Sequence, residues 1–325
     1  MKKNILMLSS TFPYPPSRGG TEIRTFNLLK YLQQNHNVTL LTQRHQEVSD
    51  VEVEELRQWV NELVIFPLPE RSQPPNPIAK ATAKIGRFAE SLAKGTPPNV
   101  LYRYSREMQA WIDKFVASGQ CDVITCEHSV NEIYIRRTFP ARTVVNIHSS
   151  VSGWIRNHLE MGASPNALRD RLYLTLLLDR YEKNYASKFN KIVVTTEDDK
   201  SQFLKYDPEA EIEIVANGVD LELFPQRPKP PTGRKLAFVG AMDASHNIDA
   251  ARFFSLEILP ELQKPYPDTE FIVVGARPVE SVLELAKRPG VTVTGAVPRV
   301  AEYLHQAAVS VVPLRSGYGI KNKTL

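Results

Sequence analysis

The chain has 325 residues, of which 42% are hydrophobic and 23% charged, as expected for a globular protein of one or two domains. Its net charge of +4 comes from Lys and Arg residues spread along the chain, which argues against a nucleic-acid-binding protein. No apolar stretch is as long as a membrane-spanning helix requires, which is about 18 residues. The two cysteines, Cys121 and Cys126, predict neither a zinc site nor a disulfide.

Residues 4–9 (NILMLS) form an apolar run without alternation, which is typical of a buried strand in a parallel sheet. A loop rich in Pro and Gly follows, and residues 21–34 then repeat apolar side chains at helical spacing. Strands and helices alternate in this way up to residue 215, which predicts a doubly wound parallel sheet. Further strands are predicted at 38–42, 63–66, 122–126, 142–147, 191–195 and 211–215, and helices at 51–60, 78–94, 105–117, 167–189 and 197–206.

A second alternation follows the stretch FPQRPKPPTG (residues 224–233), whose Pro and Gly content indicates a stiff linker. We therefore predict an α/β protein with two Rossmann-like domains, at residues 1–220 and 234–325, joined by a linker at 221–233. A complete domain of this type has about six strands, so the second domain is expected to be incomplete. Its predicted strands are 235–240, 270–275, 291–294 and 309–313, the last one buried, and its helices are 248–263, 279–287 and 300–307.

Residues 78–94 (IAKATAKIGRFAESLAK) predict an amphipathic helix. Two interpretations stay open: the helix lies on an anionic lipid surface, or it packs on the core and turns its basic face to solvent. The side chains that share the apolar face are Ile78, Ala81, Ile85, Phe88 and Leu92, and the basic ones beside or opposite it are Lys80, Lys84, Arg87 and Lys94.

Ligands of open parallel sheets bind at the carboxyl ends of the strands, so the residues that follow each strand are candidates for a site. Gly19 and Gly20 lie between the first strand and the first helix, where they either admit a phosphate or form a plain turn. His148 follows another strand and could contact a substrate hydroxyl or move a proton, or be structural. The pair Glu127 and His128 leaves the same two alternatives.

In the second half, Gly240, Gly275 and the turn 295–297 with Val297 follow predicted strands. The last residues, SVVPLRSGYGIKNKTL (310–325), place Arg315 and a glycine turn between a strand and the predicted start of a helix. Free N–H groups at a helix start favour an anion, which predicts a phosphate site at Arg315, Gly319, Lys321 and Lys323. The sequence has no P-loop, no G-x-S-x-G elbow and no metal motif.

Four segments together resemble glycosyltransferase family 4 (group 1), and the resemblance spans nearly the whole chain. It implies the GT-B fold and a retaining nucleotide-sugar transferase, with the acceptor in the N-terminal domain and the nucleotide-sugar in the C-terminal domain. The segments are FPYPPSRGG (12–20), ANGVDLELF (216–224), VGARPVESVLELAKRPGVTVTGAVPRVAEYL (274–304) and VPLRSGYGIKNKTL (312–325).

The resemblance also implies roles for individual residues. Gly19 and Gly20 would lie by the donor phosphates, His148 would contact the donor sugar, and the turn with Val297 would meet the base. No metal or other cofactor is expected, because protein cations can stabilise the charge of the leaving diphosphate. Those cations would be Arg315, Lys321 and Lys323.

The sequence departs from the family pattern in two places. Ala241 and Asn247 stand where many members carry an Arg and a Lys that bind the donor diphosphate. The glutamate that binds the donor ribose would follow Leu325, so the resemblance implies a chain truncated at its C-terminus.

We therefore expect a hexosyltransferase-type enzyme that uses a glycan or lipid-linked acceptor in the cytoplasmic assembly of surface polysaccharide or glycolipid. Glu127 and His128 are its acceptor-side candidates, loops 67–76 and 153–166 would set acceptor choice, and residues 78–94 would touch the inner face of the membrane. No nucleic acid partner is expected. Two alternatives remain, a sugar-nucleotide epimerase of the same fold and an inactive fragment that binds a sugar-nucleotide.

Overall fold

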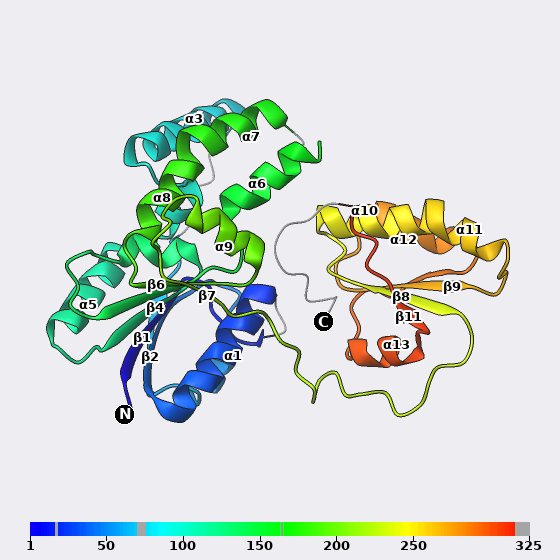
Figure 1. The fold of residues 1–325 in the computed structure, drawn as a ribbon, viewed down its shortest axis with the longest axis horizontal. Coiled ribbons are helices and arrows are strands. Elements are labelled where there is room, and N and C mark those ends of the chain that lie inside the picture. Colours follow the sequence, from blue (N-terminus) through cyan, green and yellow to red (C-terminus); the bar gives the residue numbers. More distant parts are fainter. Residues whose placement is uncertain (17–18, 70–75, 163, 165, 316–325) are drawn as a thin grey trace. The chain divides into compact units, whose positions relative to one another are not determined.

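The computed structural model describes residues 1–16, 19–69, 76–162, 164 and 166–315. The chain folds into two compact units, Met1–Ala216 (unit 1) and Asn217–Leu325 (unit 2), each built on its own parallel sheet (Figure 1). The predicted α/β class with two Rossmann-like parts is thereby confirmed. The assignment of the acceptor to one part and the donor to the other stays a prediction.

Unit 1 contains a seven-stranded sheet in the order β3-β2-β1-β4-β5-β6-β7. Every neighbouring pair is parallel, and Ile5 of β1 pairs with Val38 on one side and Val123 on the other. The carboxyl ends of all strands therefore point to one edge of the sheet. The strands are β1 Asn4–Ser9, β2 Asn37–Arg44, β3 Glu62–Pro67, β4 Val123–Glu127, β5 Arg142–Asn146, β6 Lys191–Val194 and β7 Ile212–Ile214.

Helices cover both faces of this sheet, because successive side chains of a strand point to opposite sides. Leu6 and Leu8 of β1 pack in one core with residues of α5, α8 and α9, whereas Met7 packs in another with residues of α1 and α2. All three β1 side chains are fully buried. The helices are α1 Gly20–Asn35, α2 Asp50–Arg57, α4 Pro98–Arg103, α5 Arg106–Ala117, α8 Asp179–Ala186 and α9 Glu197–Leu204, with a 3₁₀ helix at Ser129–Tyr134.

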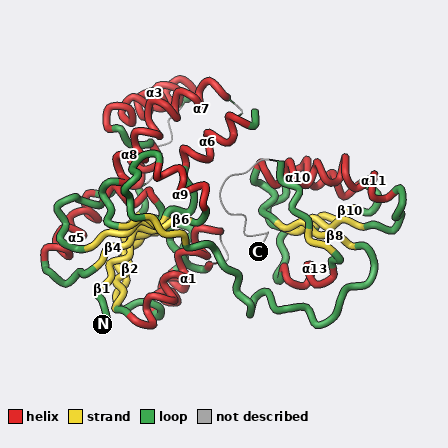
Figure 2. Tube along the Cα trace, viewed as in Figure 1, coloured by secondary structure: helices red, strands yellow, loops and turns green. Residues whose placement is uncertain are grey.

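Three more helices of unit 1 lie together beyond α8, away from the sheet (Figures 1 and 2). They are α3 Pro77–Lys94, α6 Val151–Glu160 and α7 Ala167–Tyr173. A π-helical turn, Leu174–Leu178, joins α7 directly to α8. The helix predicted at 167–189 is therefore continuous, but one wide turn shifts the phase of its apolar face.

Helix α6 corrects the prediction of a loop at 153–166, because residues 153–160 are helical. The sequence there contains Gly, Asn and His, which weakens the helical pattern. The helix forms because Ile155 is buried in a small core with Leu174 and Leu178, and because the Ser150 hydroxyl caps the amide of Gly153 at 3.0 Å.

Two described apolar side chains of helix α3 bear on the interpretation of residues 78–94 as a core-packed helix, whereas a contact with lipid stays a prediction. Ile85 is 70% exposed and Phe88 is 37% exposed, so these apolar side chains do not pack in a core. The interpretation as a core-packed helix is wrong for this part of the helix.

Unit 2 contains a four-stranded parallel sheet in the order β10-β9-β8-β11. Its strands are β8 Lys235–Val239, β9 Glu270–Val274, β10 Val291–Val293 and β11 Val309–Ser310. Its helices are α10 Ser245–Phe253, a π-helical turn Phe254–Ile258, α11 Leu259–Gln263, α12 Glu280–Leu283, a 3₁₀ helix Glu284–Lys287 and α13 Val300–Gln306.

A strand is present at the start of the predicted stretch 309–313, but the prediction that it is buried is wrong. Strand β11 has two residues, Val309 is 52% exposed and Ser310 is exposed. Among the described residues β11 pairs with β8 alone, so it lies at the edge of the sheet, where one side lacks a neighbour.

The stretch between β7 and β8 runs from residue 215 to residue 234, entirely within the described residues, and contains no helix or strand. Residues 225–227 of this stretch are bonded to the end of α13. Arg227 Nη1 donates to the carbonyl of Ala307 at 2.9 Å, and His305 Nε2 lies 2.8 Å from the carbonyl of Pro225.

Candidate functional site

The two predicted histidines meet at the carboxyl edge of the unit 1 sheet. Strands β4 and β5 are neighbours, with Glu127 opposite Asn146, so His128 and His148 follow adjacent strands. The His128 amide donates to the carbonyl of Asn146 at 2.8 Å. The two imidazole rings pack edge to face, with their centroids 5.2 Å apart.

Burial keeps both imidazoles neutral. It lowers the pKa of His148 to about 3, and electrostatic repulsion from the neighbouring His128 and Arg24 lowers it further. It lowers the pKa of His128 to about 4, and the positive charge of Arg103 lowers it further. His148 Nε2 is buried and has no hydrogen-bond partner among the described residues. A neutral imidazole with such a nitrogen is suited to contact a hydroxyl group.

Glu127 ends β4 and is buried rather than at the surface, with 1% of its area exposed. Its Oε1 accepts hydrogen bonds from Thr125 Oγ1 at 3.0 Å and Asn146 Nδ2 at 3.1 Å. Its Oε2 is buried without a partner in the described part of the chain. Burial raises the pKa of Glu127 to about 7, against the lowering effect of these hydrogen bonds and of the Arg24 charge.

Arg24 and Arg103 belong to this group, although the sequence did not single them out. Arg24 lies on α1, one turn after Gly20, and its Nη2 donates to the carbonyl of Val215 at 2.9 Å. Arg103 ends α4, and its Nη1 donates to the carbonyl of Ser10 at 2.6 Å. Arg24 could have been found from the sequence, because it lies shortly after a glycine turn that follows a strand. Arg103 could not, because α4 was not predicted.

The predicted glycine pair lies at the start of α1. Gly19 is the residue before the helix, with extended backbone and no side-chain cap, and its carbonyl accepts from the amide of Ile23. A Cβ at Gly19 would lie 2.7 Å from the carboxylate of Glu22, whereas one at Gly20 would meet nothing within 4 Å. The turn therefore needs no glycine for its backbone angles, and Gly20 leaves the helix start unobstructed.

Buried carboxylates fix the loop that carries His148, between β5 and α6. Glu182 of α8 accepts from the amides of Val151 at 2.9 Å and Ser152 at 3.2 Å, and from the hydroxyls of Ser150 and Ser152. Asp199 of α9 accepts from the amide of Ser150 at 2.8 Å. These bonds satisfy amides that a helix start leaves without partners, and the negative charges suit the positive end of its dipole.

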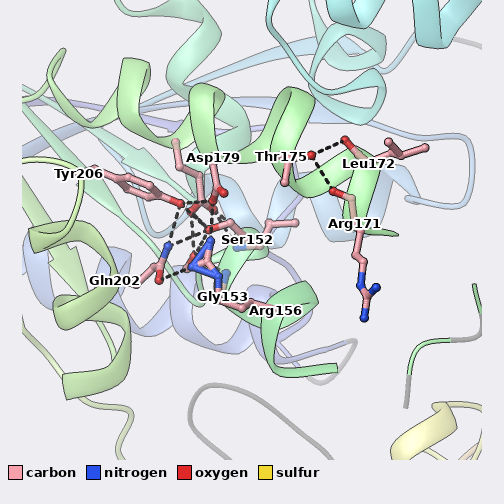
Figure 3. A network of polar contacts seen from close by, with 12 residues as sticks. Ser152, Gly153, Arg156, Arg171, Leu172, Thr175, Asp179, Gln202 and Tyr206 are labelled. Carbon is pink, nitrogen blue, oxygen red and sulfur yellow. Dashed lines mark hydrogen bonds and ion pairs between the residues drawn. The ribbon is translucent and has the colours of Figure 1, made fainter. Parts of the chain in front are cut away.

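Figure 3 shows a polar network that adds further hydrogen bonds between α6 and the elements α8 and α9. The hydroxyls of Ser152 and Tyr206 lie 3.0 Å apart, and Gln202 Nε2 donates to Tyr206 at 2.7 Å. The Tyr206 hydroxyl donates to Asp179 at 2.6 Å, and Arg156 of α6 donates to the same carboxylate at 2.8 Å. Helix α6 is thus tied to both neighbouring helices by side chains that lie far away in sequence.

In unit 2, Gly240, Gly275 and Val297 all follow strands of the sheet, at the same edge. The Gly275 amide donates to the carbonyl of Gly295 at 3.2 Å, and a Cβ at Gly275 would lie 1.7 Å from the Gly240 carbonyl oxygen. Gly275 also has φ +155°, so any side chain there would force the loops apart. The structure thus brings the three predicted segments together.

Arg315 lies at the same edge, beyond β11, and already has partners. Its guanidinium forms a forked ion pair with Asp249 of α10, with Nε 3.0 Å from Oδ2. It also lies over the ring of Phe253, 4.6 Å from the centroid. The other predicted phosphate ligands, Gly319, Lys321 and Lys323, lie outside the described residues.

The described residues offer neither a metal site nor a membrane-spanning helix. No group of three or more His, Cys, Asp or Glu side chains in that part of the chain could hold a metal ion. No helix in the same residues has the length and apolar character that crossing a membrane requires.

Two family models match the sequence. The model described as Glycosyltransferase Family 4 matches residues 18–223, and the model described as Glycosyl transferases group 1 matches residues 233–325. No curated protein sequence matches the chain.

Several solved structures of low sequence identity have a similar fold. TarM is 12% identical, with a TM-score of 0.62 over 100% of this chain and 82% of TarM. HepE from Anabaena, in complex with UDP and glucose, is 12% identical, with a TM-score of 0.51 over 95% of this chain and 73% of HepE. OtsA, a trehalose-6-phosphate synthase, is 12% identical, with a TM-score of 0.53 over 97% of this chain and 79% of OtsA.

Proposed function

The chain belongs to glycosyltransferase family 4 and has the GT-B fold, and on this basis we propose that it transfers a sugar from a nucleotide-sugar to a glycan or lipid-linked acceptor with retention of configuration. The observation that carries the proposal is the buried, partnerless Nε2 of the neutral His148, at the edge of the sheet where ligands bind. HepE, a structural neighbour, was solved with UDP and glucose, which supports a nucleotide-sugar as the donor class.

In this proposal the nucleotide binds at the carboxyl edge of the unit 2 sheet. The touching loops at Gly240, Gly275 and Gly295 let a ligand approach the backbone closely, and Val297 contacts the base. Arg315 and, outside the described residues, Gly319, Lys321 and Lys323 bind the diphosphate. Gly19 and Gly20 face the donor phosphates from the start of α1. We propose no metal or other cofactor, because cations can stabilise the charge of the leaving group.

His148 would act on the sugar rather than on the diphosphate. A neutral ring nitrogen can form a hydrogen bond with a sugar hydroxyl that strengthens as the glycosidic bond breaks. Its neighbour His128 would face the acceptor side. Glu127 is buried, so it would influence the acceptor side through its charge and its hydrogen bonds rather than by contact.

The direct test measures product formation by the purified chain. We expect it to release a nucleoside diphosphate from one donor among UDP-, GDP- and ADP-sugars when a mixture of lipid-linked and glycan acceptors is present. NMR of the product should show the anomeric configuration of the donor. Conversion of the donor into another sugar-nucleotide without acceptor would instead identify an epimerase. Donor binding without turnover would identify a binding fragment.

We also propose that unit 1 contacts an anionic membrane surface from the cytoplasmic side, through an apolar surface on α3 and the helix that contains α7. Ile85 and Phe88 of α3 are exposed, and the Phe88 ring contacts that of Tyr173, 6.3 Å away between centroids. Exposed basic side chains on the same helices, Lys84, Arg87 and Arg171 among them, suit anionic lipid. Three leucines spaced four residues apart along the second helix are also exposed, at 47–72%: Leu168, Leu172 and Leu176.

Replacing Ile85 with glutamate should therefore weaken binding to vesicles of phosphatidylcholine with about one third phosphatidylglycerol by roughly tenfold or more, because an apolar contact is lost and a like charge is added. Co-sedimentation measures the effect. The matched control is Val51→Glu on α2, where valine is similarly exposed at 66%. Equal binding of both variants and the wild type would contradict the proposed surface.

A further inference from the structure

The loops after β8 and β9 carry an ion pair that the sequence did not reveal. Arg277 Nε lies 2.6 Å from Asp243 Oδ2, and Arg277 Nη2 lies 3.3 Å from Asp243 Oδ1. The two loops touch, because the Met242 amide donates to the carbonyl of Ala276 at 2.8 Å. The pair therefore lies at the carboxyl edge of the unit 2 sheet, beside Gly240 and Gly275.

The backbone at Arg277 is unusual. Its φ is +55°, in the left-handed region that residues with a Cβ adopt at a cost in energy. The described residues contain one other non-glycine residue with positive φ, His128, which lies in the candidate site of unit 1. Strain of this kind persists where the surrounding structure or a function maintains it, so an observed outlier is a reason to look for a function.

Stability does not account for an arginine at this position. The side chain of Arg277 is 61% exposed and that of Asp243 is 43% exposed. Exposed ion pairs add little to stability, because water screens the charges and both side chains lose freedom. A glycine would adopt the same backbone without strain, as Gly295 does with φ +69°.

The chemistry of the pair fits a diphosphate. A guanidinium presents a planar fork of N–H donors that matches phosphate oxygens as well as carboxylate oxygens. A diphosphate carries more charge than Asp243 and would meet Arg277 next to the start of α10, which has no side-chain cap. Helix α10 has nine residues, so its first-turn amides would add to the attraction.

We propose that Arg277 is a ligand of the donor's diphosphate, and that Asp243 holds its guanidinium in place until the nucleotide binds. The inference rests on the proposed function, because it assumes a nucleotide-sugar at this edge of unit 2. Arg277 would take over the role of the Arg and Lys that many family members carry where this chain has Ala241 and Asn247. Arg277 would then act beside Arg315, whose guanidinium is held in a similar way by Asp249.

The test compares the Kd of nucleoside diphosphates for the wild type and Arg277→Gly by calorimetry, with UDP, GDP, ADP and dTDP as probes. We expect the diphosphate that binds best to bind the variant about tenfold or more weakly, while the melting temperature stays equal or rises because the strain is relieved. The parent nucleoside should bind both proteins equally. Arg277→Lys, which keeps the charge but loses the fork, should recover part of the affinity.

The matched control is Arg234→Ala. Arg234 forms a similarly exposed ion pair with Asp268, in which Nη1 donates to both carboxylate oxygens, but it precedes β8 and so lies at the opposite edge of the same sheet. Its loss should leave the Kd unchanged. An unchanged Kd in Arg277→Gly overturns the role of Arg277 and leaves the proposed function standing. Failure of all four diphosphates to bind the wild type contradicts the proposed function itself, and this inference with it.

Discussion

Replacing His148 with alanine is expected to lower kcat by about 100-fold or more, a usual effect of removing a positioned imidazole or one hydrogen-bond donor to a transition state. The Kd of the nucleoside diphosphate should change by less than about twofold, because the ring is proposed to contact the sugar and not the diphosphate. Steady-state kinetics with the best donor and calorimetry with the matching diphosphate measure the two effects.

Two further variants are needed to interpret that result. His148→Gln keeps a polar atom near the position of Nε2 and should recover part of kcat. His158→Ala removes a histidine of α6 whose Nδ1 is bonded to the carbonyl of Trp154 at 3.0 Å, so it controls for loss of a ring nearby. A parallel loss of turnover and diphosphate affinity in His148→Ala would mean that the ring only maintains the structure.

Replacing Glu127 with glutamine is expected to stabilise unit 1 at high pH and not at low pH. The pKa of this carboxyl is raised from 4.5 to about 7, mainly by burial. The folded state therefore holds the proton more firmly than the unfolded state, so the stability that this group contributes is fully present below pH 4.5 and is lost as pH rises through about 7. A shift of this size corresponds to about 3 kcal/mol of unfolding free energy at pH 8.

A glutamine at 127 stays neutral and can still accept from Thr125 and Asn146. Its advantage over the wild type should grow from near zero at pH 4.5 and level off above pH 7, as measured by urea unfolding at a series of pH values. Glu209→Gln, at an exposed position before β7, should leave the pH dependence as in the wild type. Parallel curves for Glu127→Gln and the wild type would show that Glu127 does not titrate in this range.

Local sequence predicted the fold well because the strands of parallel sheets are apolar runs bounded by loops. Strand β1 was predicted at its observed bounds, and the chain positions of Gly240, Gly275 and His148 at strand ends followed from the same pattern. That Gly275 lies beside Gly240 in one sheet, and His148 beside His128 in the other, follows from parallel pairing, which brings the carboxyl ends of the strands of a sheet to one edge.

What the sequence did not predict depends on partners far away in the chain. Helix α6 has a weak local pattern and receives its anchor from Glu182, 31 residues after Val151. The ion pairs of Arg277 with Asp243 and of Arg315 with Asp249 join loops to residues 34 and 66 positions away. Nothing in the local pattern around these arginines indicates which carboxylate will hold them.

The anchor of α6 has a consequence for the order in which the protein assembles. The loop with His148 is fixed by Glu182 and Asp199, and Asp199 is 49 residues beyond the Ser150 amide that it binds. A ribosome that adds residues one after another must therefore pass position 199 before this loop can close, and contacts of such long separation form late. We expect the loop to be among the last parts of unit 1 to acquire its final conformation as the nascent chain folds.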